Sequence, residues 1–200
     1  MLQSVKAALI SAPGEGRPVH VLGADLTIRI SSRDTNGAFA AFEGHTPRLG
    51  GPPLHRHRDQ DEWWYIVKGE YRFEVDGEEI YAYEGDTVFA PRGSSHTFQN
   101  IGAEPGCTLG MSVPGGIDLF FEEVDAVAPR GAKPDFAKIV PIAEKYGHEL
   151  LGPPLRARSG WPIDPVGVSG EGYWWAAWAN PNPAGAAMKS GNLRKQRQAA

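Results

Sequence analysis

Three histidines and one glutamate have the residue types and spacing of a metal-binding site. His55 and His57 are separated by one residue, so on a strand their imidazole rings point to the same face. Glu62 follows shortly after them, and His96 lies further along the chain. Imidazole nitrogens together with a carboxylate suit a divalent first-row metal ion. An alternative interpretation of the histidines is a hydrogen-bonded pair in the core of a barrel.

Short β-strands separated by tight turns are predicted around these residues. The chain contains 25 glycines and 17 prolines, which are spread along it. Glycine and proline residues that recur between short apolar segments disfavour a helical bundle and are typical of a β-sandwich or β-barrel. The turns at Gly85 and at Pro91–Gly93 bring His96 back toward the first histidines. The predicted strands are residues 25–31 and 37–43, the hairpin 63–83, and residues 87–90, 96–101 and 107–113.

The hairpin at residues 63–83 has the clearest sequence signal. Asp76 and Gly77 lie between two alternating segments, and this dipeptide favours a two-residue turn with two positive φ angles. Such a turn pairs Val75 with Glu78, and it continues the same register back along both strands. The alternation puts a largely apolar face on a core, as expected for a closed antiparallel sandwich.

Helical periodicity replaces the strand pattern after the sequence Pro114-Gly115-Gly116. We predict a short helix over residues 117–124 and a second one over residues 135–146, interrupted at Pro141. The predicted organisation is an N-terminal lead-in at residues 1–20, a β-barrel at 21–125, a helical extension at 126–155 and a terminal segment at 156–200. That last segment is rich in tryptophan and ends in a basic tail, for which we expect disorder.

The composition excludes several classes of protein. The 20 basic and 24 acidic residues give a net charge of −4, which does not favour binding to nucleic acid. Cys107 is the only cysteine, so no internal disulfide forms. No apolar segment approaches the ~18 residues that a membrane span requires. We therefore expect a cytoplasmic protein with no membrane or nucleic-acid partner.

Two segments of the chain resemble the paired motifs of the cupin superfamily, G(x)5HxH(x)3–4E(x)6G and G(x)5PxG(x)2H(x)3N. The first motif departs from the pattern at its leading glycine, where Leu49 stands. The resemblance is specific over residues 50–113 and looser over residues 26–155. The matched positions are His55, His57, Glu62 and Gly69 in the first motif, and Gly85, Pro91, Gly93, His96 and Asn100 in the second.

The resemblance implies an all-β fold, a cupin jelly-roll β-barrel with short C-terminal helices and an irregular tail. It also implies that His55, His57, Glu62 and His96 hold one divalent metal ion per chain. Fe(II) is favoured, and Mn, Ni, Co or Zn also accept these donors. Metal loss is expected as the pH falls through roughly 6.5, where unperturbed histidines become charged.

Within the superfamily, the chain is most similar to small bacterial quercetin dioxygenase-like cupins. The segments DEWWYIVKGEYRFEVDG and PGGIDLFFEEV carry this similarity. It implies a dioxygenase that cleaves a flavonol-like or other enolisable aromatic substrate with O2, with Glu62 acting as a base as well as a ligand. Two alternatives stay open, a non-catalytic module that binds a metal or small ligand, and a cupin isomerase or lyase.

Three aromatic side chains are candidates for a substrate pocket, with core packing as the alternative. Trp64 shares the inward face of its strand with Glu62, and Phe98 shares that of His96. Tyr71 lies on the apolar face of the hairpin. Trp63 and Tyr65 point outward, which suggests burial in a homodimer. The remaining residues of interest, His20, His45, His148 and Cys107, are interpreted as ordinary structural residues.

Overall fold

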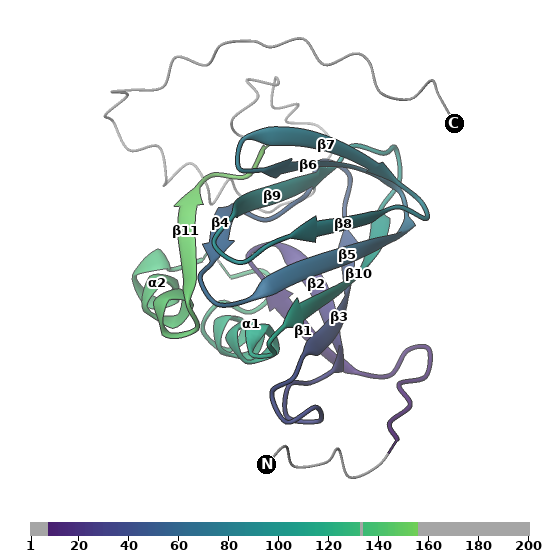
Figure 1. Cartoon of the computed structure of the whole chain (residues 1–200). Coiled ribbons are helices and arrows are strands. Elements are labelled where there is room, and N and C mark those ends of the chain that lie inside the picture. The colour runs from purple at the N-terminus through teal and green to yellow at the C-terminus, as the bar shows by residue number, and fades with distance from the viewer. Residues whose placement is uncertain (1–7, 133, 156–200) are drawn as a thin grey trace.

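A computed structural model describes residues 8–132 and 134–155, and these residues form two facing antiparallel sheets with two short helices (Figure 1). The all-β jelly-roll prediction is confirmed. The six-stranded sheet has the order β1 (Arg17–Val21), β2 (Ala24–Ile30), β3 (Ala40–Thr46), β10 (Gly106–Val113), β5 (Asp61–Lys68) and β8 (Thr87–Ala90). The five-stranded sheet has the order β11 (His148–Gly152), β4 (Leu54–His57), β9 (Ser95–Asn100), β6 (Glu70–Val75) and β7 (Glu78–Tyr83).

The hairpin of β6 and β7 has the predicted register. Val75 pairs with Glu78, and Tyr71 pairs with Ala82. Asp76 and Gly77 have φ angles of 49° and 82°, as a type I′ turn requires. The inward face is buried at Tyr71 and Ala82. The dipeptide therefore fixes which residues of β6 face the interior.

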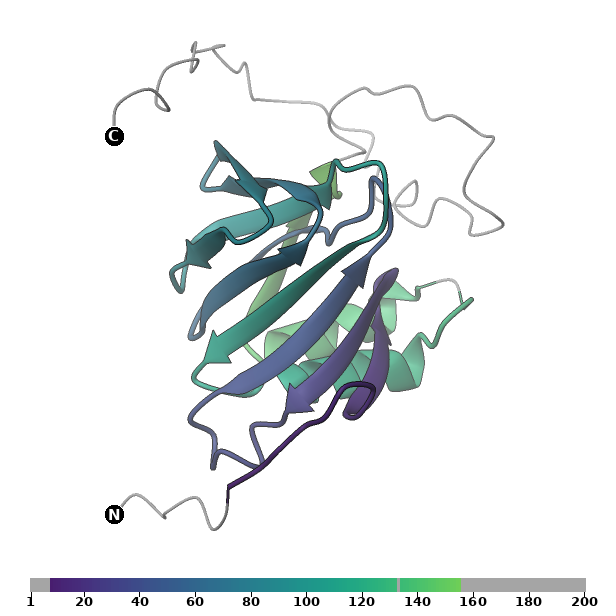
Figure 2. The ribbon, with the colours of Figure 1, turned by 90° about the vertical axis from the view of Figure 1, so that its right-hand side faces the viewer.

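Helix α1 (Ile117–Val127) covers the open side of the barrel beside β1 and β3 (Figure 2). Its buried Asp118 anchors the first turn, because Oδ2 accepts hydrogen bonds from the Ser31 hydroxyl at 2.7 Å and the Ser32 backbone N–H at 2.9 Å. This anchor holds Phe120 and Phe121 against the interior, where Phe121 makes an edge-to-face contact with Phe42 at 5.1 Å between ring centroids.

Helix α2 (Phe136–Lys145) differs from its prediction because it passes through Pro141 without a break. The Asp135 side chain caps it by accepting the Ala137 N–H at 3.1 Å. Pro141 lies on the exposed side, whereas Ile139 and Ala143 are buried against the rest of the molecule. The burial of this apolar stripe offsets the one hydrogen bond that proline cannot donate.

Two strands lie outside the predicted barrel boundaries. β1 starts at Arg17, inside the expected lead-in, because its backbone pairs with β2 despite the nearby glycines and prolines. β11 lies in the predicted helical extension, yet it pairs with β4 as an edge strand of the five-stranded sheet. Both pairings depend on a partner strand that local sequence patterns do not identify. The predicted tryptophan-rich segment and basic tail, residues 156–200, lie outside the described residues.

On the outer face of the six-stranded sheet, Tyr65 is 39% exposed and Trp63 is half-buried. Their outward direction follows from the burial of Trp64 between them. Homodimerisation through this face stays a prediction. Neither described helix is long and apolar enough to cross a bilayer.

Candidate metal centre

The four predicted ligands come together inside the barrel from both sheets. His55 and His57 lie on β4, and His96 lies on the adjacent β9, where it pairs directly with His55. Glu62 extends from β5 in the opposite sheet. One potential ligand atom from each residue lies within 4.8 Å of those of the other three. The site therefore bridges the two sheets at a place that only the closed barrel creates.

The Glu62 carboxyl group lies between two imidazole rings. Its Oε2 is 3.3 Å from Nε2 of His57 and 3.2 Å from Nε2 of His96. All three side chains are buried, and His55 is half-buried at the edge of the group. Nε2 of His57 has no hydrogen-bond partner, although it is shielded from solvent. A buried nitrogen lone pair without a donor is costly, and a metal ion in contact with it would remove that cost.

Hydrogen bonds to the far side of each ring set the tautomer of the three histidines. Nδ1 of His55 donates to the Pro53 carbonyl at 2.8 Å, and Nδ1 of His96 donates to the Ser94 carbonyl at 3.2 Å. Carbonyl oxygens only accept, so the proton must be on Nδ1. In both rings the Nε2 lone pair is left free to bind an ion, which is how metal-ligating histidines are usually oriented.

The Gln60 amide accepts the hydrogen bond from Nδ1 of His57 and so leaves Nε2 of this ring free as well. Nε2 of Gln60 donates to the Gly115 carbonyl at 3.3 Å, so its Oε1 is turned toward the histidines. This oxygen is 3.4 Å from Nδ1 of His57 and accepts a stronger hydrogen bond from Nε2 of His148 at 2.8 Å. Three imidazoles that are held by hydrogen bonds on the side away from the site, together with one carboxylate, fit a divalent first-row ion.

His148 is a residue of the site that the sequence analysis missed. It lies on β11 directly opposite His57, with 4.1 Å between ring centroids, and it is 1% exposed. We interpreted it as ordinary because it has no motif spacing and lies in a segment predicted to be helical. The only available signal was a histidine at the start of a short apolar segment after the helix-ending Gly147.

Gln60 is expected to contribute to metal affinity without touching the ion. Gln60→Ala removes the acceptor for both His57 and His148 and frees the His57 ring to rotate. We expect the dissociation constant for a divalent ion to rise by about 10- to 100-fold, as is typical when a ligand loses its hydrogen-bonding partner. Calorimetric titration with Mn²⁺ measures this change. Gln99→Ala is the control, and equal affinities in the two variants would contradict the role of Gln60.

Burial governs the protonation of the site. It lowers the pKa of His55 and of His96 to about 4, and it lowers that of His57 well below its usual value. Burial also raises the pKa of Glu62 to about 7, against the opposing effect of His55. At neutral pH the imidazoles are therefore uncharged, and a protonated Glu62 can donate a hydrogen bond to Nε2 of His96, which leaves Nε2 of His57 without a donor.

This arrangement changes the pH dependence expected from the histidines alone. Metal binding must displace the proton of Glu62 below about pH 7, whereas the histidines stay neutral to much lower pH. We expect the association constant to fall about 10-fold per pH unit below 7 and to be nearly constant above it. Calorimetry in buffers of different ionisation enthalpy should detect about one released proton per ion at pH 6.

The control for this pH prediction is Glu62→Gln, whose affinity should be nearly independent of pH between 5 and 7. A wild-type dependence centred near 6.5 that persists in Glu62→Gln would show that the histidines titrate instead, as we first expected from the sequence.

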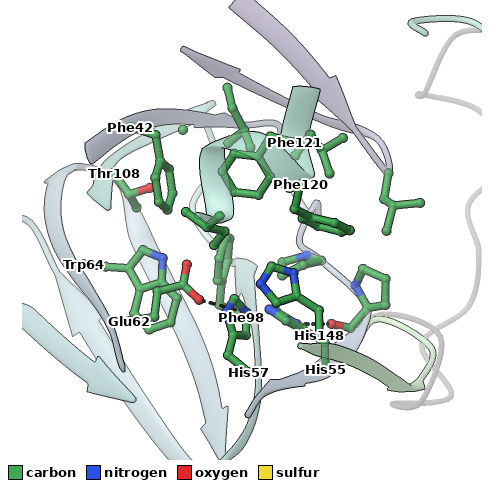
Figure 3. Close-up of a pocket in the computed structure, with 18 of the residues that line it drawn as sticks. Phe42, His55, His57, Glu62, Trp64, Phe98, Thr108, Phe120, Phe121 and His148 are labelled. Atoms are coloured by element: carbon green, nitrogen blue, oxygen red, sulfur yellow. Dashed lines mark hydrogen bonds and ion pairs between the residues drawn. The ribbon is translucent and has the colours of Figure 1, made fainter. Parts of the chain in front are cut away.

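A cavity of about 90 Å³ opens next to the metal centre, and three of the four candidate ligands, His55, His57 and Glu62, line it (Figure 3). Aliphatic and aromatic side chains from both sheets and from α1 form most of its wall. Trp64 and Phe98 line it, as predicted. Its remaining aromatic and polar walls include Phe42, Phe120, Phe121, Thr108 and His148.

Tyr71 differs from its prediction as a pocket residue. Its side chain is fully buried and lies behind Phe98, with 5.7 Å between ring centroids, so it does not line this cavity. The alternation of β6 gives the correct inward face, but the depth along the barrel decides which inward residues reach the site. Tyr71 belongs to the core cluster that also contains Trp64 and Phe73.

The chain was compared with curated proteins, solved structures and protein families. A comparison with curated proteins finds no match. Solved structures that are similar include an RmlC-like cupin from Shewanella frigidimarina, with 21% identity, a TM-score of 0.49 and coverage of 60% of this chain and 99% of that one. A predicted oxalate decarboxylase from Thermotoga maritima has 24% identity, a TM-score of 0.47 and coverage of 53% and 99%. KdgF from a Halomonas species has 21% identity, a TM-score of 0.44 and coverage of 48% and 84%.

The family model described as "Cupin domain" matches residues 46–112. This range starts at the end of β3 and runs through β4, β5 and β9 into β10, so it contains all four candidate ligands. The match covers the strands that carry the candidate ligands, and residues 46–112 are similar in sequence to the cupin domain.

Proposed function

We propose that this chain is a metal-dependent cupin enzyme, a dioxygenase that acts on a small enolisable substrate. One observation carries the proposal. Three neutral imidazoles and one carboxylate converge beside a buried, largely apolar cavity. Three or four protein ligands leave coordination positions open, which is the condition for a catalytic rather than a purely structural ion.

The bound ion, with Fe(II) favoured, supplies Lewis acidity toward a substrate oxygen and redox contact with O2. The protein residues supply the remaining functions. Glu62 is the carboxylate of the site, and it accepts the proton of the substrate hydroxyl group and returns it to the product. Trp64 and Phe98 exclude water and orient an apolar substrate against the ligands.

The size of the cavity favours a small substrate. A dry apolar cavity of about 150 Å³ is known to hold one benzene molecule. The cavity here is about 90 Å³, so it suits a substrate of one ring or fewer. A three-ring flavonol requires the walls to move apart. Among the enolisable aromatic substrates expected from the resemblance, single-ring phenols are therefore the first candidates.

The test starts from the metal content of untagged protein purified without oxygen. We expect close to one iron, manganese, nickel or cobalt ion at the barrel site. Oxygen consumption is then measured with a 1,3-diketone, a catechol and a flavonol. The expected result is consumption with a small substrate, and both atoms of ¹⁸O2 in the products.

Two other outcomes would overturn the proposal that the chain is a dioxygenase. Conversion of a substrate without oxygen consumption would assign an isomerase or lyase. Saturable binding of ligand to the metal-loaded protein, with no conversion of any substrate, would assign a non-catalytic binding module.

A further inference from the structure

A second group of potential metal ligands lies on the outer face of the six-stranded sheet, away from the barrel interior. Glu43 and His45 are two residues apart on β3, and Cys107 on β10 is directly opposite His45. β3 and β10 lie side by side in the middle of this sheet (Figure 1). The residues that alternate with the three, such as Gly44 and Thr108, are buried. Their side chains therefore share the outer face.

The donor atoms of these residues are close enough for one ion. A carboxylate oxygen, an imidazole nitrogen and the Cys107 sulfur all lie within 4.8 Å of one another. Glu43 Oε1 and His45 Nε2 are 2.9 Å apart as an ion pair. Bond lengths to zinc of about 2.0 Å for nitrogen and 2.3 Å for sulfur place the ligands of one tetrahedral ion about 3.3–3.8 Å apart. The three donors therefore lie within about 1 Å of the spacing that one ion requires.

We propose that Glu43, His45 and Cys107 form a second metal site that takes a borderline divalent ion such as Zn²⁺. A thiolate, an imidazole and a carboxylate are a recognised combination of zinc ligands, and water can complete the tetrahedron. The inner site offers nitrogen and oxygen donors alone. Sulfur makes the outer site the softer of the two, so the two sites differ in metal preference.

The outer group is accessible from solvent through His45. The Cys107 side chain is half-buried. Burial and the nearby Glu43 raise the thiol pKa, and Lys68, opposite Cys107 on β5, lowers it. His45 is largely exposed, so an ion reaches the site from solvent without opening the barrel. The three ligands also connect β3 to β10, so a bound ion stabilises the pairing of these strands.

The chain offers a specific spectroscopic test, because Cys107 is its only cysteine. Titration of the full-length protein with Co²⁺ is followed by the sulfur-to-cobalt charge-transfer absorption in the near ultraviolet. No other residue of this chain can give that band. We expect a saturable band that Zn²⁺ displaces and that is absent in Cys107→Ser.

Further variants test whether the whole group acts as one site. His45→Ala and Glu43→Gln should each weaken Co²⁺ binding, measured by the same band, by at least about 10-fold. Two variants should keep wild-type affinity at this site, His57→Ala/His96→Ala in the barrel and Gln99→Ala in the five-stranded sheet. Circular dichroism shows whether each variant is folded.

Two results would overturn the proposal. One is the absence of the band at millimolar Co²⁺ in folded wild-type protein. The other is a band whose affinity neither His45→Ala nor Glu43→Gln changes, since this would mean that the thiol binds cobalt alone. As an independent measurement, Zn²⁺ should slow alkylation of Cys107 in wild type and not in His45→Ala. Equal protection in both would also contradict a shared site.

Discussion

The double variant His57→Ala/His96→Ala is expected to bind a divalent ion in the barrel more than about 100-fold more weakly than wild type. Loss of a supporting hydrogen bond behind one ligand typically costs 10- to 100-fold, and this change removes two direct donors. His57 comes from β4 and His96 from β9, and both have an Nε2 atom close to Glu62 Oε2. Only His55 and Glu62 would remain, and two donors do not enclose an ion.

Metal content and calorimetric titration measure this effect. The titration is made in the Cys107→Ser background, so that the outer group does not contribute. His20→Ala is the matched control, because His20 lies on β1 in the six-stranded sheet, away from the inner histidines, and its ring pairs with Asp25 at 2.9 Å. Retention of one tightly held ion by the folded double variant would mean that the inner histidines are not its ligands.

The direction of the candidate side chains was predictable from the sequence because successive residues of a β-strand point to opposite faces of the sheet. His55 and His57 face the same way because they are two apart on one strand. The type I′ turn at Asp76 and Gly77 fixes the register of β6 and β7. Such local rules decide which side chains point inward. They place Trp64 and Phe98 on the same inward faces as Glu62 and His96, whereas the resemblance to the cupin motifs implies that the four ligands converge.

Long-range pairing accounts for what the sequence did not reveal. His148 reaches His57 because β11 adds to the edge of the five-stranded sheet beside β4, after two intervening helices. No periodicity in residues 126–155 identifies that partner strand. The role of Gln60 could not be predicted from local sequence either, because its hydrogen-bond partners Gly115 and His148 are distant in the chain. The supporting hydrogen bonds therefore depend on which distant segments the fold brings together, whereas the inward direction of each ligand depends only on its position along its own strand.

Long-range pairing also explains why the sequence alone did not identify Cys107 as a candidate ligand. A cysteine in the middle of a strand is most simply a small buried residue, and alternation alone does not say what lies across the sheet. The register of β3 and β10 places it opposite His45. The outer group of donors exists only through that pairing.

Glu62→Gln is expected to lower kcat by about 10²- to 10⁴-fold at saturating metal, with the substrate that gives the fastest oxygen consumption. This range is typical for removal of a group that transfers a proton in the rate-limiting step. The amide has nearly the same shape as the carboxyl group and keeps an oxygen for the ion, so metal binding is weakened but still saturable. It cannot accept a proton from a substrate hydroxyl group.

Asp61→Asn is the matched control for that variant. Asp61 is the neighbouring residue, and its carboxylate pairs with Arg92 at 2.8 Å on the protein surface. The Asp61→Asn variant also loses one negative charge, yet it should keep the wild-type kcat. Metal content is measured in both variants at the end of each assay, because a loss of activity that follows a loss of metal would reveal only a ligand. If Glu62→Gln is fully loaded with metal and turns over at the wild-type rate, Glu62 is not the proton acceptor, and another group beside the cavity, such as His148, must take that role.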